Sequence, residues 1–349
     1  MVSAGGRRSG RRRVTPPLRT VRGVGPTRVR MPGPGAPDPV LAACGMPATA
    51  VEYVAARFPD AAAWFAEQVA AGRVVGDGGV VVTPETPYDP GASVWFHRPV
   101  PDEDAPPVTL EVLYADEWII AVDKPHGLCS TPKGENVRRS VVVAARCQFH
   151  NDEIAALHRL DRSTGGVLLL CRHAEDRGDF HRMFQERTVR KTYWAVARVN
   201  DRVDRETVRV ESRIRKIQGV VQAFEEPGEV NAVTDVRLAK RFTDDDGEWG
   251  LYEVAPLTGR THQIRVHMTS LGLPLRGDKL YPDPREDFDV EDPDNPLQLI
   301  ARSIAFTHPR TGRETVVESR LTPSSHEAWR RGHAALAEGP LGMLDRNAS

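Results

Sequence analysis

The sequence places one carboxylate, Asp161, between two arginines and directly ahead of a Thr-Gly-Gly turn and the apolar run 167–170. The guanidinium groups of Arg159 and Arg162 would hold this carboxylate in its ionised form. An ionised and well-positioned Asp is a candidate covalent nucleophile. An ordinary surface turn with an Asp–Arg ion pair has the same local pattern, so other parts of the chain must decide between the two interpretations.

Five segments, taken in order along the chain, resemble the successive motifs of the RluA-type pseudouridine synthases. They are 116–128 (DEWIIAVDKPHGL), 158–166 (HRLDRSTGG), 190–196 (RKTYWAV), 257–267 (LTGRTHQIRVH), and Gly277-Asp278 with Tyr281. The resemblance extends from residue 113 to residue 309, which is more than half of the chain. Five matches in the order of the family are far more specific than a single short motif.

The resemblance implies an isomerase that converts uridine in RNA into pseudouridine without a metal or another cofactor. This reaction breaks the glycosidic bond, rotates the uracil and re-forms the link through carbon 5. The family assigns the nucleophile to Asp161. It points to Tyr193 for stacking on the uracil and for proton transfer. It also implies that Arg265 pairs with the Asp161 carboxylate and keeps it ionised and aimed.

Further side chains are candidate contacts to the RNA. In the family, the arginine at the position of Arg159 enters the space that the flipped nucleotide leaves, because a guanidinium stacks and hydrogen-bonds at once. A surface ion pair is the alternative for this residue. The remaining candidates are Arg162, Lys191, Arg260 and His262. Lys191 could instead anchor an acid, Arg260 and His262 could support a helix end, and we expect His262 and His267 to be neutral.

Two positions depart from the pattern of the family. Gly165 stands where the family usually has Ser, which predicts a looser loop after Asp161. Ile300 stands where the family usually has His. The loss of that contact need not stop catalysis.

The composition bounds the class of protein. The 349 residues are 40% hydrophobic and 27% charged, as in a soluble globular protein, and no apolar run approaches the roughly 20 residues that a membrane span needs. The four cysteines are widely spaced, which fits reduced thiols and neither zinc nor a disulfide framework. We therefore expect a cytoplasmic protein that uses no metal and no cofactor.

The charges are distributed unevenly. Residues 1–38 contain nine arginines and one acid, so the rest of the chain has a net charge of −9. An RNA enzyme with an acidic body must concentrate its positive charge on one face or use the arginine-rich segment to attract phosphate. We expect residues 1–46 to be a disordered tail; an upstream extension or a transit peptide would have the same composition.

The remaining sequence predicts three further regions. Residues 47–105 form a small helix–strand module, because apolar residues recur at three- or four-residue steps from Val54 to Val69 and are interrupted at Pro59. This module resembles a small α/β RNA-binding module, although a plain structural extension fits equally well. Residues 108–325 form the catalytic domain, and residues 326–349 form a C-terminal helix or tail.

The catalytic region alternates apolar strands with short helices. The expected strands are 119–122, 167–170, 193–199, 208–210, 233–238 and 251–254, and the expected helices are 178–186 and 260–271. Most connections are too short for parallel crossovers. The pattern therefore predicts an α+β domain built on a mixed, largely antiparallel sheet, as the family resemblance also implies.

Two segments have unusual charge. The segment 201–228 carries basic residues that either select the RNA or form a solvated strand face: Arg209, Arg213, Arg215 and Lys216. The segment 284–296 is rich in acids and prolines, which predicts a solvated loop.

Two other functions fit parts of the sequence. The first is a non-catalytic RNA-binding or ribosome-assembly factor on the same fold, which would not need Asp161, Tyr193 and Arg265 together. The second is a carboxylate-based glycosidase, which normally needs two acids across one bond, and no motif places a second one. We expect the partner to be ribosomal or transfer RNA and the protein to be a monomer without an obligatory protein partner.

Overall fold

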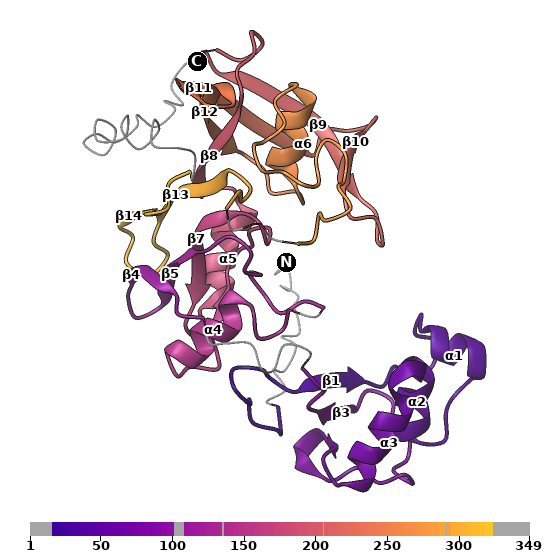
Figure 1. Cartoon of the computed structure of the whole chain (residues 1–349). Coiled ribbons are helices and arrows are strands. Elements are labelled where there is room, and N and C mark those ends of the chain that lie inside the picture. The colour runs from indigo at the N-terminus through magenta and orange to yellow at the C-terminus, as the bar shows by residue number, and fades with distance from the viewer. Residues whose placement is uncertain are drawn as a thin grey trace, which may run out of the picture. The chain divides into compact units, whose positions relative to one another are not determined.

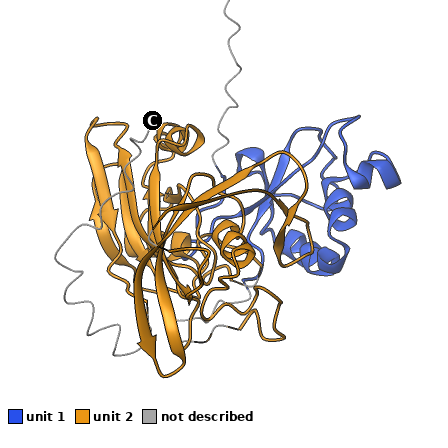
Figure 2. Cartoon of the chain, turned by 90° about the horizontal axis from the view of Figure 1, so that it is seen from above, with its two compact units in different colours: residues 1–103 blue, residues 104–349 orange. Residues whose placement is uncertain are grey.

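The computed structural model describes residues 16–100, 108–134, 136–204, 206–290, 292 and 294–323. Helices and strands of these residues are labelled in Figure 1. The chain divides into two compact units between residues 103 and 104 (Figure 2). Residues 326–349, expected to form a helix or tail, lie outside the described residues. None of the described helices combines the length and the hydropathy of a bilayer-spanning segment.

The first unit combines helices with a small antiparallel sheet. The strand order is β1 (Thr27–Arg30), β3 (Ser93–Phe96) and β2 (Val75–Gly76). The helices are α1 (Pro39–Cys44), α2 (Ala50–Arg57) and α3 (Ala62–Ala70). Pro59 begins the short 3₁₀ turn that separates α2 from α3, as the interrupted apolar pattern predicts.

The expectation of a disordered tail over residues 1–46 is wrong for residues 16–46. Strand β1 lies in this range, and Val29 and Met31 belong to the buried core of the first unit. The Asp38 carboxylate caps α1 by accepting hydrogen bonds from two backbone N–H groups. The apolar residues of β1 are ordered because β1 pairs with β3, more than 60 positions later in the chain. The local composition of residues 1–46 gives no sign of such a distant contact.

The second unit is built on one eleven-stranded sheet. Its order is β10-β9-β11-β12-β8-β13-β7-β5-β4, with β14 on β13 and β6 on β7. The first four strands of this sheet along the chain are β4 (Glu111–Ala115), β5 (Ile119–Lys124), β6 (Ala155–Ala156) and β7 (Gly165–Cys171). The others are β8 (Arg190–Arg198), β9 (Val208–Lys216), β10 (Ala223–Glu226), β11 (Ala232–Asp244), β12 (Gly247–Pro256), β13 (Leu299–Thr307) and β14 (Glu314–Glu318).

The expected α+β class with a mixed, largely antiparallel sheet is confirmed. Among the described strands of this sheet, β7 and β13 pair in parallel and the other pairs are antiparallel. The helices of the unit are α4 (Val141–Gln148), α5 (Arg177–Gln185) and α6 (Gln263–Ser270). Helix α4 was not expected, because its run of three valines favours a strand by propensity alone.

Strands β5 and β7 are apolar on both faces because a helix covers each face. Ile120 and Leu168 belong to the cluster that includes residues of α4. Ile119 and Leu169 belong to the opposite cluster, with Phe180 of α5. Helix α6 covers a different part of the sheet and packs on β8, β11 and β12. The three helices thus fix the sheet from which the functional loops extend.

The parallel contact between β7 and β13 brings two motifs together. Gly166 pairs with Ala301 of β13, and Ala301 pairs on its other side with Tyr193 of β8. Gly166 has φ +109°, and a Cβ atom there would lie 2.3 Å from the carbonyl oxygen of Ala301. Only glycine allows this approach. The strand that follows the Asp161 loop is therefore separated from the strand of Tyr193 by β13 alone.

We expect Gly166→Ala to lower the free energy of unfolding of the second unit by about 3 kcal/mol or more, through backbone strain and the clash with Ala301. Chemical denaturation followed by circular dichroism measures this loss. The matched control is Gly178→Ala in α5, where a Cβ meets nothing within 4 Å. That change should be neutral or stabilising by up to about 1 kcal/mol. Equal effects of the two variants would contradict the proposed constraint.

Candidate active site

A buried lysine fixes the loop that carries Asp161. Lys124, at the end of β5, is fully buried. Its ammonium group donates to the carbonyl oxygens of Pro125 at 2.9 Å, Leu128 at 2.7 Å and Arg162 at 2.9 Å. These three bonds satisfy the donors of a charge that would otherwise be costly to bury. Because Arg162 directly follows Asp161, Lys124 holds the backbone of the loop.

The loop after Asp161 is tightly packed, so the expectation of a looser loop at Gly165 is wrong. A Cβ atom at Gly165 would lie 2.8 Å from Nε2 of His126. Nδ1 of His126 lies 2.6 Å from the carbonyl oxygen of Ser163. His126, from the Lys-Pro-His-Gly turn, therefore occupies the space that a side chain at position 165 would need.

Asp161 is half-buried at the start of a turn in which the Thr164 N–H donates to the Asp161 carbonyl oxygen at 3.1 Å. Its carboxylate accepts no hydrogen bond from any residue that the structure describes. Burial, and then the charge of Asp161, raises the pKa of the Tyr193 phenol well above its usual value. The carboxylate thus interacts electrostatically with Tyr193, while its lone pairs accept no hydrogen bond from the described residues.

Tyr193 lies in the middle of the sheet, opposite Val254 of β12 on one side and Ala301 of β13 on the other. Its ring packs against two core clusters, one that includes residues of α4 and one that includes residues of α6. Within the described part of the chain, the phenol forms no hydrogen bond. Because its pKa is raised, the phenol is protonated at neutral pH.

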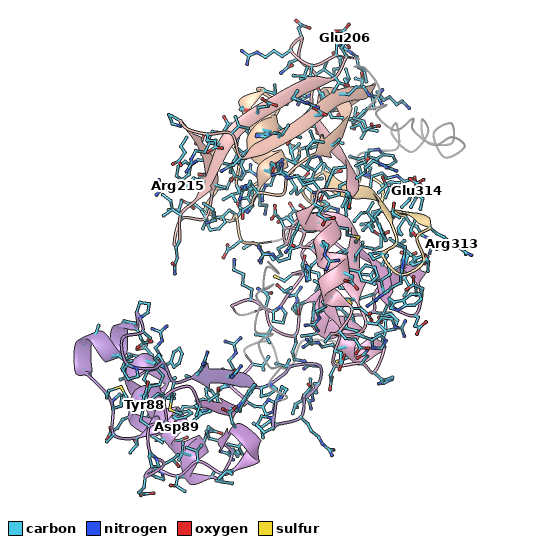
Figure 3. The ribbon with its side chains drawn as sticks, turned by 180° about the vertical axis from the view of Figure 1, so that it is seen from behind. Tyr88, Asp89, Glu206, Arg215, Arg313 and Glu314 are labelled. Atoms are coloured by element: carbon cyan, nitrogen blue, oxygen red, sulfur yellow. The ribbon has the colours of Figure 1, made fainter. Side chains whose placement is uncertain are left out.

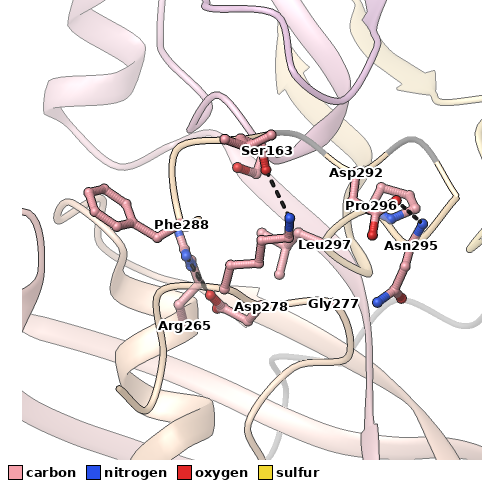
Figure 4. A pocket seen from close by; sticks show the side chains of 11 residues that line it. Ser163, Arg265, Gly277, Asp278, Phe288, Asp292, Asn295, Pro296 and Leu297 are labelled. Carbon is pink, nitrogen blue, oxygen red and sulfur yellow. Dashed lines mark hydrogen bonds and ion pairs between the residues drawn. The ribbon is translucent and has the colours of Figure 1, made fainter. Parts of the chain in front are cut away.

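Arg265 forms its ion pair with Asp278, so the expectation of a direct pair with Asp161 is wrong. Its Nε and Nη2 donate to the two carboxylate oxygens of Asp278 at 2.8 and 2.6 Å (Figure 4). Its guanidinium also lies over the Tyr281 ring, 5.0 Å from the centroid. Although burial acts against it, the pKa of Arg265 is raised, first by Asp278 and then by the charge of Asp161. The interaction with Asp161 therefore acts at longer range.

Asp278 is held as firmly as the arginine that it binds. Its side chain is fully buried. One of its oxygens also accepts hydrogen bonds from the backbone N–H groups of Leu280 at 2.8 Å and Tyr281 at 3.0 Å. Such a carboxylate fixes the orientation of the Arg265 guanidinium. The sequence contained the signal for this residue, since Gly277-Asp278 is one of the matched motifs, but gave no role for it.

Helix α6 begins at a glutamine that sequence reasoning missed. The buried Gln263 accepts hydrogen bonds from Thr258 Oγ1 at 2.7 Å and Arg260 N at 3.0 Å. Its amide nitrogen donates to the carbonyl oxygen of Val233 at 3.0 Å and to Thr234 Oγ1 at 2.9 Å. Two of these bonds attach the start of α6 to β11 and two attach it to the preceding loop, so the position of Arg265 in the first turn of α6 is fixed.

The two histidines around α6 are bound to hydroxyl groups. Nδ1 of His262 lies 3.0 Å from the Tyr281 hydroxyl, and the backbone of His262 is left-handed, with φ +56°. Burial lowers the pKa of His262, and the charge of Asp161 opposes this shift. His267 lies between Thr234 Oγ1 at 2.8 Å and Ser212 Oγ at 3.0 Å, and burial lowers its pKa to about 4. His267 is therefore neutral at pH 7, as expected.

The candidate RNA contacts surround this centre with different degrees of exposure. Arg159 and Arg260 are exposed, and Nε of Arg260 donates to the carbonyl oxygen of Asn231 at 3.1 Å. Lys191 is half-buried, donates to the Thr258 carbonyl oxygen at 3.4 Å, and has a pKa lowered by burial. The Arg162 guanidinium donates to the carbonyl oxygen of Asp289.

In the 201–228 segment, Arg209, Arg213 and Arg215 form ion pairs on the strand surface, whereas Lys216 donates to the carbonyl oxygens of Ile217 and Val220. Arg209 binds both carboxylate oxygens of Asp235, at 2.7 and 2.9 Å. Arg213 and Arg215 both bind Glu226, at 2.8 and 3.1 Å, across the β9–β10 pair. Figure 3 shows the position of Arg215. The three arginine side chains are therefore already paired with carboxylates in the free protein.

The described residues contain no group of three or more His, Cys, Asp or Glu side chains that could hold a metal ion. The four cysteines are free thiols. The groups around Asp161 can nevertheless supply a nucleophile, a protonated phenol and a fixed cation. This combination suits a substitution at carbon that is assisted by proton transfer.

Comparison with known proteins assigns this arrangement to one family. Residues 118–270 match the family model described as RNA pseudouridylate synthase. An uncharacterized RNA pseudouridine synthase of Synechocystis is 34% identical over 219 residues, which are 62% of this chain and 72% of that protein. The dual-specificity RNA pseudouridine synthase RluA of Vibrio cholerae is 35% identical over 206 residues, 58% of this chain and 79% of that protein. The ribosomal large subunit pseudouridine synthase C of Rickettsia conorii is 29% identical over 211 residues, 60% of this chain and 67% of that protein.

We expect Asp278→Asn to lower the free energy of unfolding by about 3–5 kcal/mol, because it leaves the buried Arg265 guanidinium without its carboxylate. The control is Asp246→Asn. Asp246 is 60% exposed and shares Arg276 with the buried Asp244, so this change should cost less than about 1 kcal/mol. Denaturant titration of both variants measures the difference, and a similarly small loss for Asp278→Asn would contradict a buried anchor.

His267 makes stability depend on pH. Because its pKa is about 4 in the folded protein and about 6.5 when unfolded, the unfolded chain takes up the proton first. Its contribution is complete above pH 6.5 and is lost as the pH falls toward 4, by about 2–3 kcal/mol. His267→Gln should lose stability at pH 7 but show a correspondingly smaller decrease between pH 6.5 and 4. The exposed His150 is the control, and His150→Asn should leave the decrease unchanged.

Proposed function

This chain belongs to the RluA-type RNA pseudouridine synthases, which isomerise uridine in RNA to pseudouridine, and from that premise we propose that Asp161, Tyr193 and Arg265 carry the reaction. The observation that supports this assignment most directly is the uncommitted Asp161 carboxylate. It lies within electrostatic reach of a protonated phenol and of a fixed, buried guanidinium. The three side chains come from three different motifs of the chain.

Asp161 is the nucleophile. Its carboxylate attacks the target nucleotide, the N1–C1′ bond breaks, and the detached uracil rotates within the pocket. The bond that the Asp161 oxygen formed to C1′ breaks as carbon 5 bonds to C1′. Carbon 5 then loses its proton and N1 gains one, so substrate and product have the same composition and no redox step is needed. A carboxylate that accepts no hydrogen bond keeps its lone pairs available for this attack.

Tyr193 stacks on the uracil and takes part in the final proton transfer. A raised pKa keeps its phenol protonated at neutral pH, so the group acts as a donor or relay for a proton and not as a free phenolate. Its position in the centre of the sheet holds the ring in one orientation.

Arg265 favours the ionised form of Asp161 from a distance. Because its two strongest hydrogen bonds go to Asp278, its positive charge acts on Asp161 without occupying the attacking oxygens. A direct bidentate pair would stabilise the carboxylate but would also make it a weaker nucleophile.

We assign the RNA contacts to side chains around the centre: Arg159, Arg162, Lys191, Arg260 and His262. Arg159 is exposed and suits the space that the flipped nucleotide leaves. The substrate is ribosomal or transfer RNA, and the name of the Rickettsia relative indicates the large ribosomal subunit for that protein. We further propose a cytoplasmic monomer whose first unit adds RNA-binding surface.

Asp161→Asn should abolish pseudouridine formation, by at least about 1000-fold, because the amide cannot act as the nucleophile. Its affinity for RNA should stay within about twofold, since the change is nearly isosteric. Mass spectrometry of RNA incubated with each protein measures the product, and filter binding measures the affinity. Asp152→Asn, an exposed acid between α4 and β6, is the control and should retain full activity. Retained activity of Asp161→Asn would refute the nucleophile assignment, and loss of both properties would indicate misfolding.

A further inference from the structure

An acidic segment borders a pocket that Ser163 and Arg265 line. We call residues 283–290, which contain four acids and one arginine, the acidic strap. The expectation of a freely solvated loop over 284–296 is wrong for this part, because Phe288 packs against the cluster that includes Val266 and Tyr281. Phe288 and Val290 line one pocket together with Ser163 and Arg265 (Figure 4). The strap therefore borders the candidate active site.

The acidic strap engages two cations at this pocket. The ammonium group of Lys279 lies 2.7 Å from a carboxylate oxygen of Asp287 and donates to the carbonyl oxygen of Val290 at 3.1 Å. The Arg162 guanidinium donates to the carbonyl oxygen of Asp289. Lys279 is only 15% exposed, whereas Asp287 is 53% exposed. The lysine is built into the pocket wall, and the carboxylate that covers it faces the solvent.

This arrangement has the chemistry of a phosphate site that is filled by the protein's own oxygens. Ammonium and guanidinium groups bind phosphate as well as carboxylate. A nucleotide that is flipped into the pocket brings its flanking phosphates to the rim. The acids of the strap would repel these phosphates, so RNA and the strap cannot both occupy the two cations.

We propose that Lys279 and Arg162 form a subsite for an RNA backbone phosphate beside the target uridine, and that the acidic strap fills this subsite until the RNA displaces it. The proposal rests on the function proposed above and adds Lys279 to the binding surface. The exchange is inexpensive because Asp287 is more than half exposed, and such an ion pair contributes little to stability. The strap thereby favours RNA that presents a phosphate at this position over other polyanions.

Two substitutions that break the same ion pair test the proposal. Asp287→Asn should tighten the binding of a fluorescein-labelled single-stranded RNA that contains uridine by about 3–10-fold, because it weakens the competitor. Lys279→Gln should weaken binding by a similar factor and reduce the slope of log Kd against log salt by about 0.7, the value for one phosphate contact on a single strand. Lys279→Arg should keep most of the affinity. Fluorescence anisotropy at several salt concentrations measures all three.

Matched charge changes on the β11–β12 hairpin provide the controls. Asp245→Asn and Arg241→Gln alter the net charge by the same amounts, and Arg241 also pairs with acids. If the ion pair is purely structural, Asp287→Asn and Lys279→Gln should lower the melting temperature by similar amounts. The two variants should then either shift RNA affinity in the same direction or shift it no more than the controls do. Either result overturns the proposal. A single-turnover assay of product formation at saturating RNA tests the proposed function separately from the subsite. Absence of pseudouridine with the unaltered protein would refute the function. Opposite shifts in the RNA affinity of the two variants would still support the subsite.

Discussion

Strands β7 and β13 pair in parallel over two residues, and this short contact joins the half of the sheet that supplies Asp161 to the half that supplies Tyr193 and Arg265. One half is closed by α4 and α5, and the other is covered by α6. Asp161 and the two side chains proposed to act with it therefore come from separate cores. The distance between them depends on how closely Gly166 approaches Ala301, where any side chain would meet the backbone. A site assembled in this way is accurate only if both cores are rigid.

Each buried cation of the site is satisfied without the use of Asp161. Lys124 binds three carbonyl oxygens, and Arg265 binds Asp278. The costs of burying these charges are thus met by groups that take no part in the reaction. Asp161 remains the acid that feels the nearby positive charge but accepts no hydrogen bond. The carboxylate that binds the buried Arg265 is thus Asp278, and the proposed nucleophile is a different residue.

The sequence predicts the elements whose pattern is local and misses those that depend on distant partners. Strands β5, β7, β8, β9, β11 and β12 and the helices α5 and α6 follow from periodicity, whereas β4, β6, β10, β13 and β14 were not expected. The motif resemblance groups Asp161, Tyr193 and Arg265 as the expected site. The predicted ion pair between Arg265 and Asp161 is wrong, because the sequence does not show which of two carboxylates, Asp161 or Asp278, the arginine binds. These two residues are 117 positions apart. The composition predicts a disordered segment at strand β1 and a solvated loop at the acidic strap. Val29 and Phe288 are ordered by contacts with distant residues, which composition does not reveal.

The charge balance of the chain now has a structural interpretation. Outside the arginine-rich segment the chain has a net charge of −9, yet its family binds a polyanion. Several described cations of the second unit are paired with the protein's own oxygens, as Arg209 is with Asp235 and Lys279 with Asp287. RNA must then replace internal contacts, and the gain per phosphate is smaller than for an open basic surface. The general electrostatic attraction between this protein and RNA is therefore weak. Discrimination between RNA substrates then depends on the shape of the pocket and on the few phosphates that fit it.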